Sequence, residues 1–282
     1  MIKRILVPLD PSPFSESALH MACNVAKELD AEVTGMVVLD IPGIEESIGP
    51  VPIGGIHLAD KLEKEKKEEA KQRIEELITK FKRKCGETGV RHREAERQGS
   101  PSAQILKESI YYDLLVVGMK TYFHFETSED YGRSLDQLLK QSITPIYGVP
   151  EKIIDFEKVD RNIRVLIAFD GSPLAARAMQ RFSQLIKPDT FEITLLNSSD
   201  DKAHGDNILS RTEEYLKGHG VKNIHKVWTQ KDIIKIIEDE YYDAMDIFVV
   251  GAHARDKIFD FLVGSLTKYL VKNAKIPVFI GQ

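Results

Sequence analysis

The sequence predicts an α/β fold with two tandem domains, each a five-stranded, mainly parallel sheet with helices on both faces. The first observation behind this prediction is that short β-branched segments alternate with longer segments whose apolar residues recur at helical spacing. Such alternation is typical of a parallel sheet built with right-handed crossovers. The second observation is that the pattern occurs twice within 282 residues, a length that can form two buried cores.

The internal repeat is clearest at the first and fourth strands of each copy. The first strands end in V-P-L-D-P-S and I-A-F-D-G-S, and the fourth strands read D-L-L-V-V-G and D-I-F-V-V-G. Asp10 and Asp170 are 160 positions apart, whereas Gly118 and Gly251 are 133 apart. The first copy therefore carries an insertion of about 27 residues between its first and fourth strands.

This spacing predicts a first domain at 1–150, a charged linker at 151–161 and a second domain at 162–282. The expected strands are 2–9, 32–39, 90–97, 114–118 and 144–149 in the first domain, and 164–169, 192–197, 222–228, 247–251 and 277–280 in the second. Residues 40–57, rich in proline and glycine, are predicted to form a loop. A long helix is expected at 58–85, with alternating lysines and glutamates on a solvated face.

The fifth strands carry Pro145 and Pro277, and proline cannot donate a hydrogen bond to a central ladder. Each fifth strand is therefore predicted to lie at a sheet edge, and bare edges invite pairing. We expect strands 144–149 and 276–281 to face each other within one chain, as an intramolecular pseudo-dimer. A homodimer of whole chains is compatible with this arrangement.

Composition excludes several classes of protein. Hydrophobic residues make up 42% of the chain and charged residues 29%, as in soluble globular proteins, and the net charge is −5. This charge gives no reason to expect nucleic acid or an anionic membrane as a partner. Without a signal peptide or a long apolar run, the protein is predicted to be cytoplasmic. Cys23 and Cys85 lack metal-site spacing, no metal site is predicted, and Cys23 is expected to be buried.

A candidate site lies where the fourth strand of the second copy ends. The strand stops at Gly251, about a dozen residues follow, and Gly264 and Ser265 open a helix. Glycine lets a phosphate approach the backbone, and the first-turn N–H groups of a helix have no helical partners. The order therefore suits phosphate binding, although an ordinary strand–loop–helix connection with Ser265 as N-cap also explains it.

The residues that follow the first strands extend this candidate site. In parallel sheets, ligands bind beyond the carboxyl ends of the strands, which places Asp170 near Gly251 and Asp10 near Gly118. Either aspartate could contact a ligand. Either could instead help to cap the helix that follows it.

The motifs D-P-S and D-G-S after the first strands, V-V-G at the fourth strands and G-S-L before the last helix together resemble the universal stress protein (UspA) family in its tandem form. The resemblance covers essentially the whole chain. It implies two Rossmann-like domains of the UspA/HUP type, and in that family dimers form through the fifth strand. ATP-binding members carry G-x-x-G, nine residues, then G-[S/T]. Here that motif maps to Gly251, Ala254, Gly264 and Ser265, with alanine in place of the second glycine.

The resemblance also implies individual roles in the second copy. Asp170 would contact the adenosine, and Gly264 and Ser265 would hold the phosphates. The full set of nucleotide-binding residues implied is Asp170, Ser198, Gly251, His253, Ala254, Gly264 and Ser265.

The first copy matches the family pattern only in part. Its second glycine is replaced by Thr121, and the loop from Gly118 to Gly132 is longer and carries bulky aromatic residues. This site is therefore expected to be degenerate. Its weaker candidate residues are Asp10, Val38, Gly118, Arg133 and Ser134.

The resemblance implies a stress-response module that binds an adenine nucleotide (ATP, ADP or AMP, with or without Mg) in its second domain. No Ser-His-Asp arrangement can be assembled around His253, so no catalytic residue is assigned and at most slow ATP hydrolysis is expected. The alternative is a scaffold or dimerisation protein whose sites are empty or hold a metal or lipid. An adenylating enzyme is disfavoured, because its S-G-G-x-D-S loop does not follow either first strand.

Overall fold

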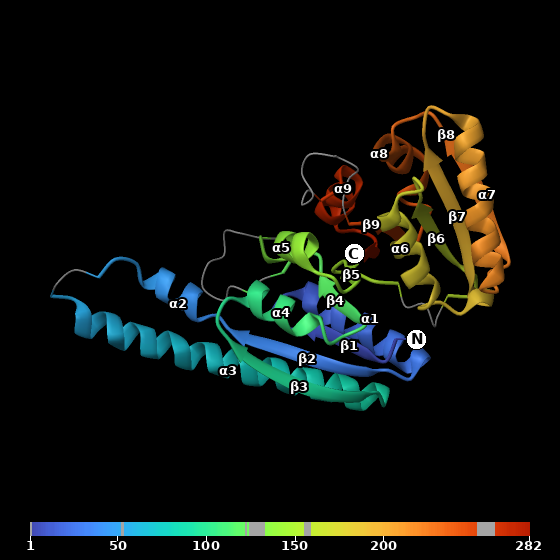
Figure 1. The fold of residues 1–282 in the computed structure, drawn as a ribbon. Helices are drawn as coiled ribbons and strands as arrows, with labels where there is room; N and C mark the ends of the chain where they lie inside the picture. The colour runs from blue at the N-terminus through green and yellow to red at the C-terminus, as the bar shows by residue number, and fades with distance from the viewer. Residues whose placement is uncertain (1, 52–53, 122, 124–132, 155–158, 253–262) are drawn as a thin grey trace.

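A computed structural model describes residues 2–51, 54–121, 123, 133–154, 159–252 and 263–282, and in it ten strands form one continuous sheet (Figure 1). The strand order is β3-β2-β1-β4-β5-β10-β9-β6-β7-β8. Neighbouring strands are parallel except for β5 and β10 at the centre, which are antiparallel. The mainly parallel α/β fold predicted from the sequence is thus confirmed.

Each half of the sheet contributes five strands with helices between them. The first half consists of β1 (Arg4–Pro8), α1 (Pro13–Leu29), β2 (Glu32–Leu39), α2 (Ile41–Ile48), α3 (Ile56–Thr88), β3 (Arg91–Gln98), α4 (Pro101–Ser109), β4 (Leu114–Gly118), α5 (Arg133–Gln141) and β5 (Ile146–Val149). The second half consists of β6 (Ile163–Ala168), α6 (Pro173–Ser183), η2 (Pro188–Thr190), β7 (Phe191–Ser198), α7 (Lys202–Gly218), β8 (Asn223–Thr229), α8 (Ile233–Ile236), η3 (Ile237–Tyr241), β9 (Ile247–Gly251), α9 (Ser265–Asn273) and β10 (Val278–Gly281).

The sheet separates two hydrophobic cores, because successive strand residues point to opposite faces. In β1, Ile5 and Val7 belong to the core that includes residues of α1, α3, α6 and α7. Leu6 belongs to the other core, with residues of α4, α5, α8 and α9. Strands β4 and β9 are covered on both faces, which explains why they read as continuous apolar runs rather than as alternating ones.

The two halves join where β5 pairs with β10, so the predicted pairing of the fifth strands is confirmed. Tyr147 lies opposite Phe279 in the register, and their rings contact edge to face with centroids 6.1 Å apart. The prolines precede these strands, and the carbonyl of Pro145 accepts a hydrogen bond from the N–H of Leu115 at 3.0 Å. Each fifth strand lies at the edge of its own half, as predicted, and the pairing of these two edges gives it a neighbour on both sides in the whole sheet.

Part of the predicted loop at 40–57 is helical, which corrects that prediction. Asp40 caps α2, because its Oδ1 accepts a hydrogen bond from the N–H of Gly43 at 3.1 Å. Pro42 lies in the first turn, where its missing N–H has no cost. Ile44 is buried and fixes the short helix against the core.

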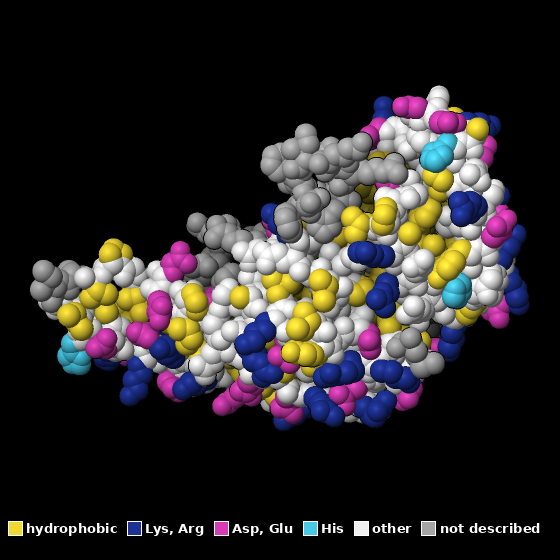
Figure 2. Space-filling view, viewed as in Figure 1, with side chains coloured by type: hydrophobic (Ala, Val, Ile, Leu, Met, Phe, Trp, Pro, Cys, Tyr) yellow, Lys and Arg dark blue, Asp and Glu magenta, His cyan; other side chains and the backbone are white. Residues whose placement is uncertain are grey.

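The long charged helix is confirmed and spans Ile56–Thr88, slightly longer than expected. Its polar face carries ion pairs one turn apart, such as Lys67 with Glu63 and Lys71 with Glu68. On the face drawn in Figure 2, basic and acidic side chains are interspersed along the molecule. This mixture supports the interpretation of the helix as a solvated, salt-bridged surface.

The second half differs from the expected elements mainly at helix ends. The sequence predicts helices at 206–219 and 231–241 in this half. Helix α7 begins at Lys202, four residues before the first of these ranges, because Asp201 caps it through the N–H of His204 at 3.0 Å. The helix predicted at 231–241 begins at Ile233 and passes from α-helix into one π-helical stretch, η3. Strand β8 lies at the outer edge of the sheet, as β3 does in the first half.

The two cysteines lie on neighbouring helices in the first half. Cys23 of α1 and Cys85 of α3 are both fully buried, which confirms the expectation for Cys23. Their sulfur atoms are 3.9 Å apart and share a weak hydrogen bond. That hydrogen bond and burial both raise the pKa of the Cys85 thiol, so it stays protonated.

In both halves, the aspartate just before the fourth strand accepts hydrogen bonds from the backbone at the start of the first strand. Asp113 accepts hydrogen bonds from the backbone N–H groups of Lys3 and Arg4 at 2.8 and 3.0 Å. Asp246 accepts one from the N–H of Arg164 at 2.8 Å, and it also binds both terminal nitrogens of the Arg161 guanidinium. The internal repeat in the sequence therefore corresponds to a repeated structural contact.

Candidate functional site

A cavity of about 250 Å³ lies beyond the carboxyl ends of β6, β7 and β9 in the second half. Ligand sites of open α/β sheets occur in this position. The cavity brings together five of the residues singled out from the sequence: Asp170, Ser198, Gly251, Gly264 and Ser265. The other two, His253 and Ala254, lie outside the described residues.

Asp170 is exposed at the rim of this cavity. Its Oδ1 accepts a hydrogen bond from the N–H of Ser172 at 2.9 Å, and Ser172 in turn caps α6 through the N–H of Ala175. The capping role considered from the sequence is therefore present. The second carboxylate oxygen, Oδ2, accepts no hydrogen bond from the part of the chain that the structure describes.

Gly251 has a packing role that the sequence reasoning missed. A Cβ on this residue would lie 3.0 Å from the backbone nitrogen of Ala175 and 3.1 Å from the carbonyl carbon of Leu174. The first turn of α6 can approach the end of β9 this closely only because residue 251 has no side chain. The Thr267 hydroxyl donates to the carbonyl of Gly251 at 2.9 Å and joins α9 to the same strand end.

Helix α9 begins beside the cavity, and its N-cap is Gly264 rather than Ser265, which corrects the capping alternative. Gly264 has no side chain to accept from the first-turn N–H groups, and Ser265 is exposed as the first helical residue. These N–H groups and the positive end of the helix dipole favour an anion here. Among the described residues that line the cavity there is no lysine or arginine, so backbone and hydroxyl donors would have to bind a phosphate.

Ser198, at the end of β7, donates its hydroxyl to the carbonyl of Lys231 at 2.7 Å, and its oxygen can still accept a hydrogen bond. The floor of the cavity is apolar, and the sequence analysis did not single it out. Its residues are Phe169, Leu196, Ile233 and Val250. Three of these are apolar residues at the ends of strands that lead to the predicted site, which is the signal that could have found them.

The first half does not gather its candidate residues in the same way. Asp10 is buried, with its Oδ1 accepting from the N–H of Ser12 at 2.7 Å. It lines a different cavity, of about 490 Å³, between α1, α3 and Glu151–Lys152. Val38, Gly118 and Ser134 do not line that cavity, and the side chain of Arg133, which begins α5, lies outside the description.

Apolar side chains pack around the end of β4 in the first half. Phe14, Met119 and Phe123 are buried in one cluster together with Val38. A Cβ on Gly118 would lie 2.6 Å from the Cβ of Phe14, so α1 presses directly on the end of β4. The same close approach of a helix to a strand end occurs at Gly251 in the second half, so the expectation that the first site is degenerate stays a prediction.

The fold and the crevice define a class: an α/β protein with an internal repeat and a ligand-sized cavity beyond the strand ends of its second half. A model of the universal stress protein family matches residues 1–143 and 201–280, more than half of the chain. The chain therefore belongs to the universal stress protein family.

Individual relatives agree with this assignment. Universal stress protein Slr1230 of Synechocystis is 20% identical over 98% of this chain and 99% of its own length. Universal stress protein MJ0531 of Methanocaldococcus jannaschii is 32% identical over 120 residues, which are 42% of this chain and 65% of that protein. A universal stress protein from Archaeoglobus fulgidus, solved by crystallography, has the same fold, with a TM-score of 0.69 at 18% identity over 99% of this chain and 98% of that one.

Across the described ranges, no helix is both long enough and apolar enough to cross a membrane.

Proposed function

We propose that this universal stress protein binds an adenine nucleotide in the crevice of its second half and acts in the cytoplasm by binding and signalling rather than by turnover. The observation that carries the proposal is the cavity that unites Asp170, Ser198, Gly251, Gly264 and Ser265 from four separate segments of the chain. The motif resemblance of these residues to ATP-binding family members supports the same proposal.

Each part of a nucleotide has a matching surface in the crevice. The apolar floor formed by Phe169, Leu196 and Val250 suits the faces of an adenine ring. Oδ2 of Asp170 can accept a hydrogen bond from a ribose hydroxyl. The N–H groups at the start of α9 and the Ser265 hydroxyl can donate to phosphate oxygens.

The chemistry available in the crevice favours binding over catalysis. Among its described lining residues, Asp170 is the sole carboxylate, and the serine and threonine hydroxyls have no histidine beside them. A phosphate bound there would be held without cationic side chains from these residues. We therefore propose an affinity that is weak to moderate.

The proposed domain division is 1–150 and 162–282, with the linker at 151–161. In this division the β5–β10 ladder is the interface between the domains, so a single chain forms a pseudo-dimer. Because the second-half crevice lies at the carboxyl ends of β6, β7 and β9, it needs no residue from the first half. The nucleotide would therefore be bound by one domain, and the sheet would connect that domain rigidly to the other.

Thermal and urea unfolding of the whole protein with and without ATP tests this function. At about 100 times its dissociation constant, ATP should raise the free energy of unfolding by about 2.7 kcal/mol. If millimolar ATP leaves both unfolding transitions unchanged, the scaffold or dimerisation alternative is favoured instead.

A further inference from the structure

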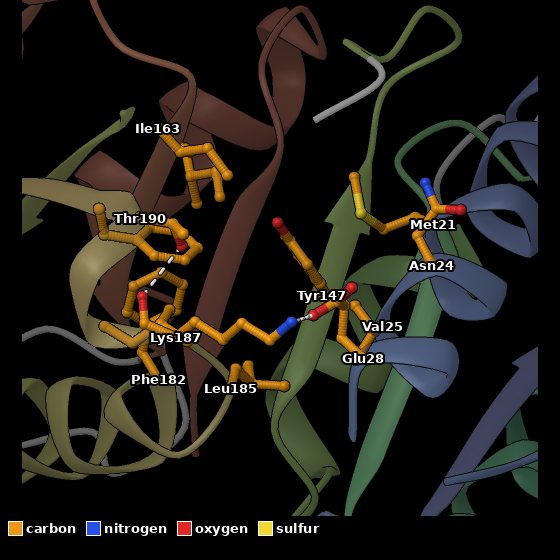
Figure 3. A pocket seen from close by; sticks show the side chains of 13 residues that line it. Met21, Asn24, Val25, Glu28, Tyr147, Ile163, Phe182, Leu185, Lys187 and Thr190 are labelled. Carbon is orange, nitrogen blue, oxygen red and sulfur yellow. Dashed lines mark hydrogen bonds and ion pairs between the residues drawn. The ribbon is translucent and has the colours of Figure 1, made fainter. Parts of the chain in front are cut away.

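A second cavity, of about 240 Å³, lies between the two halves of the molecule (Figure 3). It is bounded by α1 of the first half, by Tyr147 of β5, and by the end of α6 and the segment leading into β7. Ile163 and Ile247, which begin β6 and β9, also line it. The cavity is therefore at the amino ends of strands whose carboxyl ends form the nucleotide crevice, and the two sites are separate.

The walls of this cavity are mainly apolar, with contributions from Val25, Phe182 and Leu185. Its charged lining residues, Glu28 and Lys187, form an ion pair with each other from opposite sides of the gap (Figure 3). Their side chains are 41% and 63% exposed, so the pair is at the mouth of the cavity rather than inside it. The interior consequently suits an uncharged molecule, because a buried unpaired charge would be strongly disfavoured.

Tyr147 supplies a polar group inside this apolar cavity. The residue is only 4% exposed, and Figure 3 shows its hydroxyl directed into the gap between the halves. Among the residues that the structure describes, no group forms a hydrogen bond with this hydroxyl. Burial raises the pKa of Tyr147, so the phenol keeps its proton and remains a hydrogen-bond donor at neutral pH. The hydroxyl remains accessible from the cavity, so an acceptor on a molecule bound there can receive its hydrogen bond.

We propose that this cavity binds a small, uncharged ligand of one or two rings that carries one hydrogen-bond acceptor. An apolar cavity of about 150 Å³ can hold benzene, so the larger volume here suits a bicyclic body. The rings pack against Val25, Phe182 and Leu185, and the acceptor receives the hydrogen bond of Tyr147. Because α1 and α6 come from different halves, the bound ligand contacts both and stabilises their association.

Fluorescence titration with 2-naphthol, and with naphthalene as the reference that lacks an acceptor, tests the proposal. Tyr147→Phe keeps the ring and removes the donor, so it should weaken 2-naphthol binding about fivefold, the value of one ordinary hydrogen bond, and leave naphthalene binding nearly unchanged. Val25→Trp should prevent binding of both probes by filling the cavity. Ile143→Trp adds the same side chain at an exposed position and should leave the binding of both probes unchanged.

Three results would overturn the proposal. The first is that neither probe binds the wild-type protein. The second is that both bind Val25→Trp as tightly as wild type, which would indicate adventitious surface binding. The third is that Tyr147→Phe, shown to be folded by its melting curve, changes the affinity for both probes by the same factor. Gly264→Val should bind both probes normally, so failure of nucleotide binding and failure of this site can be told apart.

Discussion

Replacing Gly264 by valine should weaken ATP binding at least about a hundredfold. The isopropyl group would lie in front of the first-turn N–H groups of α9 and keep phosphate oxygens away from them. Hydrogen bonds to a charged group contribute about 1.5–3 kcal/mol each, so losing two of them accounts for this factor. The backbone at Gly264 has φ −57° and ψ 148°, values that valine also adopts, so the start of the helix should be retained.

The matched control is Gly132→Val, at the equivalent position of the first copy. Calorimetric titration should show ATP binding to this variant with the affinity of the wild-type protein. The opposite pattern, with binding lost in Gly132→Val and retained in Gly264→Val, would show that the nucleotide is bound by the first half.

Asp246→Asn should lower the free energy of unfolding by about 3 kcal/mol at pH 7, the lower end of the range for breaking a buried ion pair. The Asp246 side chain is only 3% exposed and forms hydrogen bonds with Arg161 at 2.6 and 2.8 Å. The lower end applies because Arg161 is 40% exposed and can be solvated when its partner is lost. Urea unfolding of both proteins measures the difference.

The contribution of Asp246 to the free energy of unfolding should decrease as the pH falls. Burial by itself would raise the pKa of Asp246, but the hydrogen bonds and charges of Arg161 and Arg164 outweigh it and lower the pKa below its ordinary value. The unfolded chain therefore takes up the proton first, and the stabilisation is lost as the pH falls below about 4. Below about pH 4, the free energies of unfolding of the wild-type protein and of Asp246→Asn should therefore become more similar.

Asp113→Asn is the control for this prediction. Asp113 occupies the same position in the first half, but it is exposed and makes its contacts with backbone N–H groups. Replacing Asp113 should lower the free energy of unfolding clearly less than replacing Asp246 does. An equal loss in both variants would show that the buried ion pair with Arg161 is not the source of the effect.

Most of the fold could be predicted because its signals are local and repeated. Continuous apolar runs mark the central strands, and Ser-Pro pairs mark the starts of α1, α4 and α6. Helix α2 was missed because its proline and glycine suggested a loop, although Asp40 and Pro42 already formed a helix-start signal. Its identity as a helix depends on Ile44 being buried, which is a tertiary contact.

The site was predictable in position but not in its packing. The order strand, glycine, loop, glycine-serine placed Gly251, Gly264 and Ser265 together, and they do line one cavity. The close approach of α6 to Gly251 and of α1 to Gly118 depends on how helices pack on strand ends. No local sequence pattern reports such distances.

Amide hydrogen exchange with and without ATP is the most direct test of the central claim, because it locates the bound nucleotide. We predict that ATP slows exchange at Ser265, Leu266 and Thr267 in the first turn of α9 and at the turn after Asp170. The corresponding amides that follow Asp10 and Gly118 should exchange at unchanged rates. Protection confined to the first half, or no protection anywhere at saturating ATP, would contradict the assignment of the nucleotide to the second-half crevice.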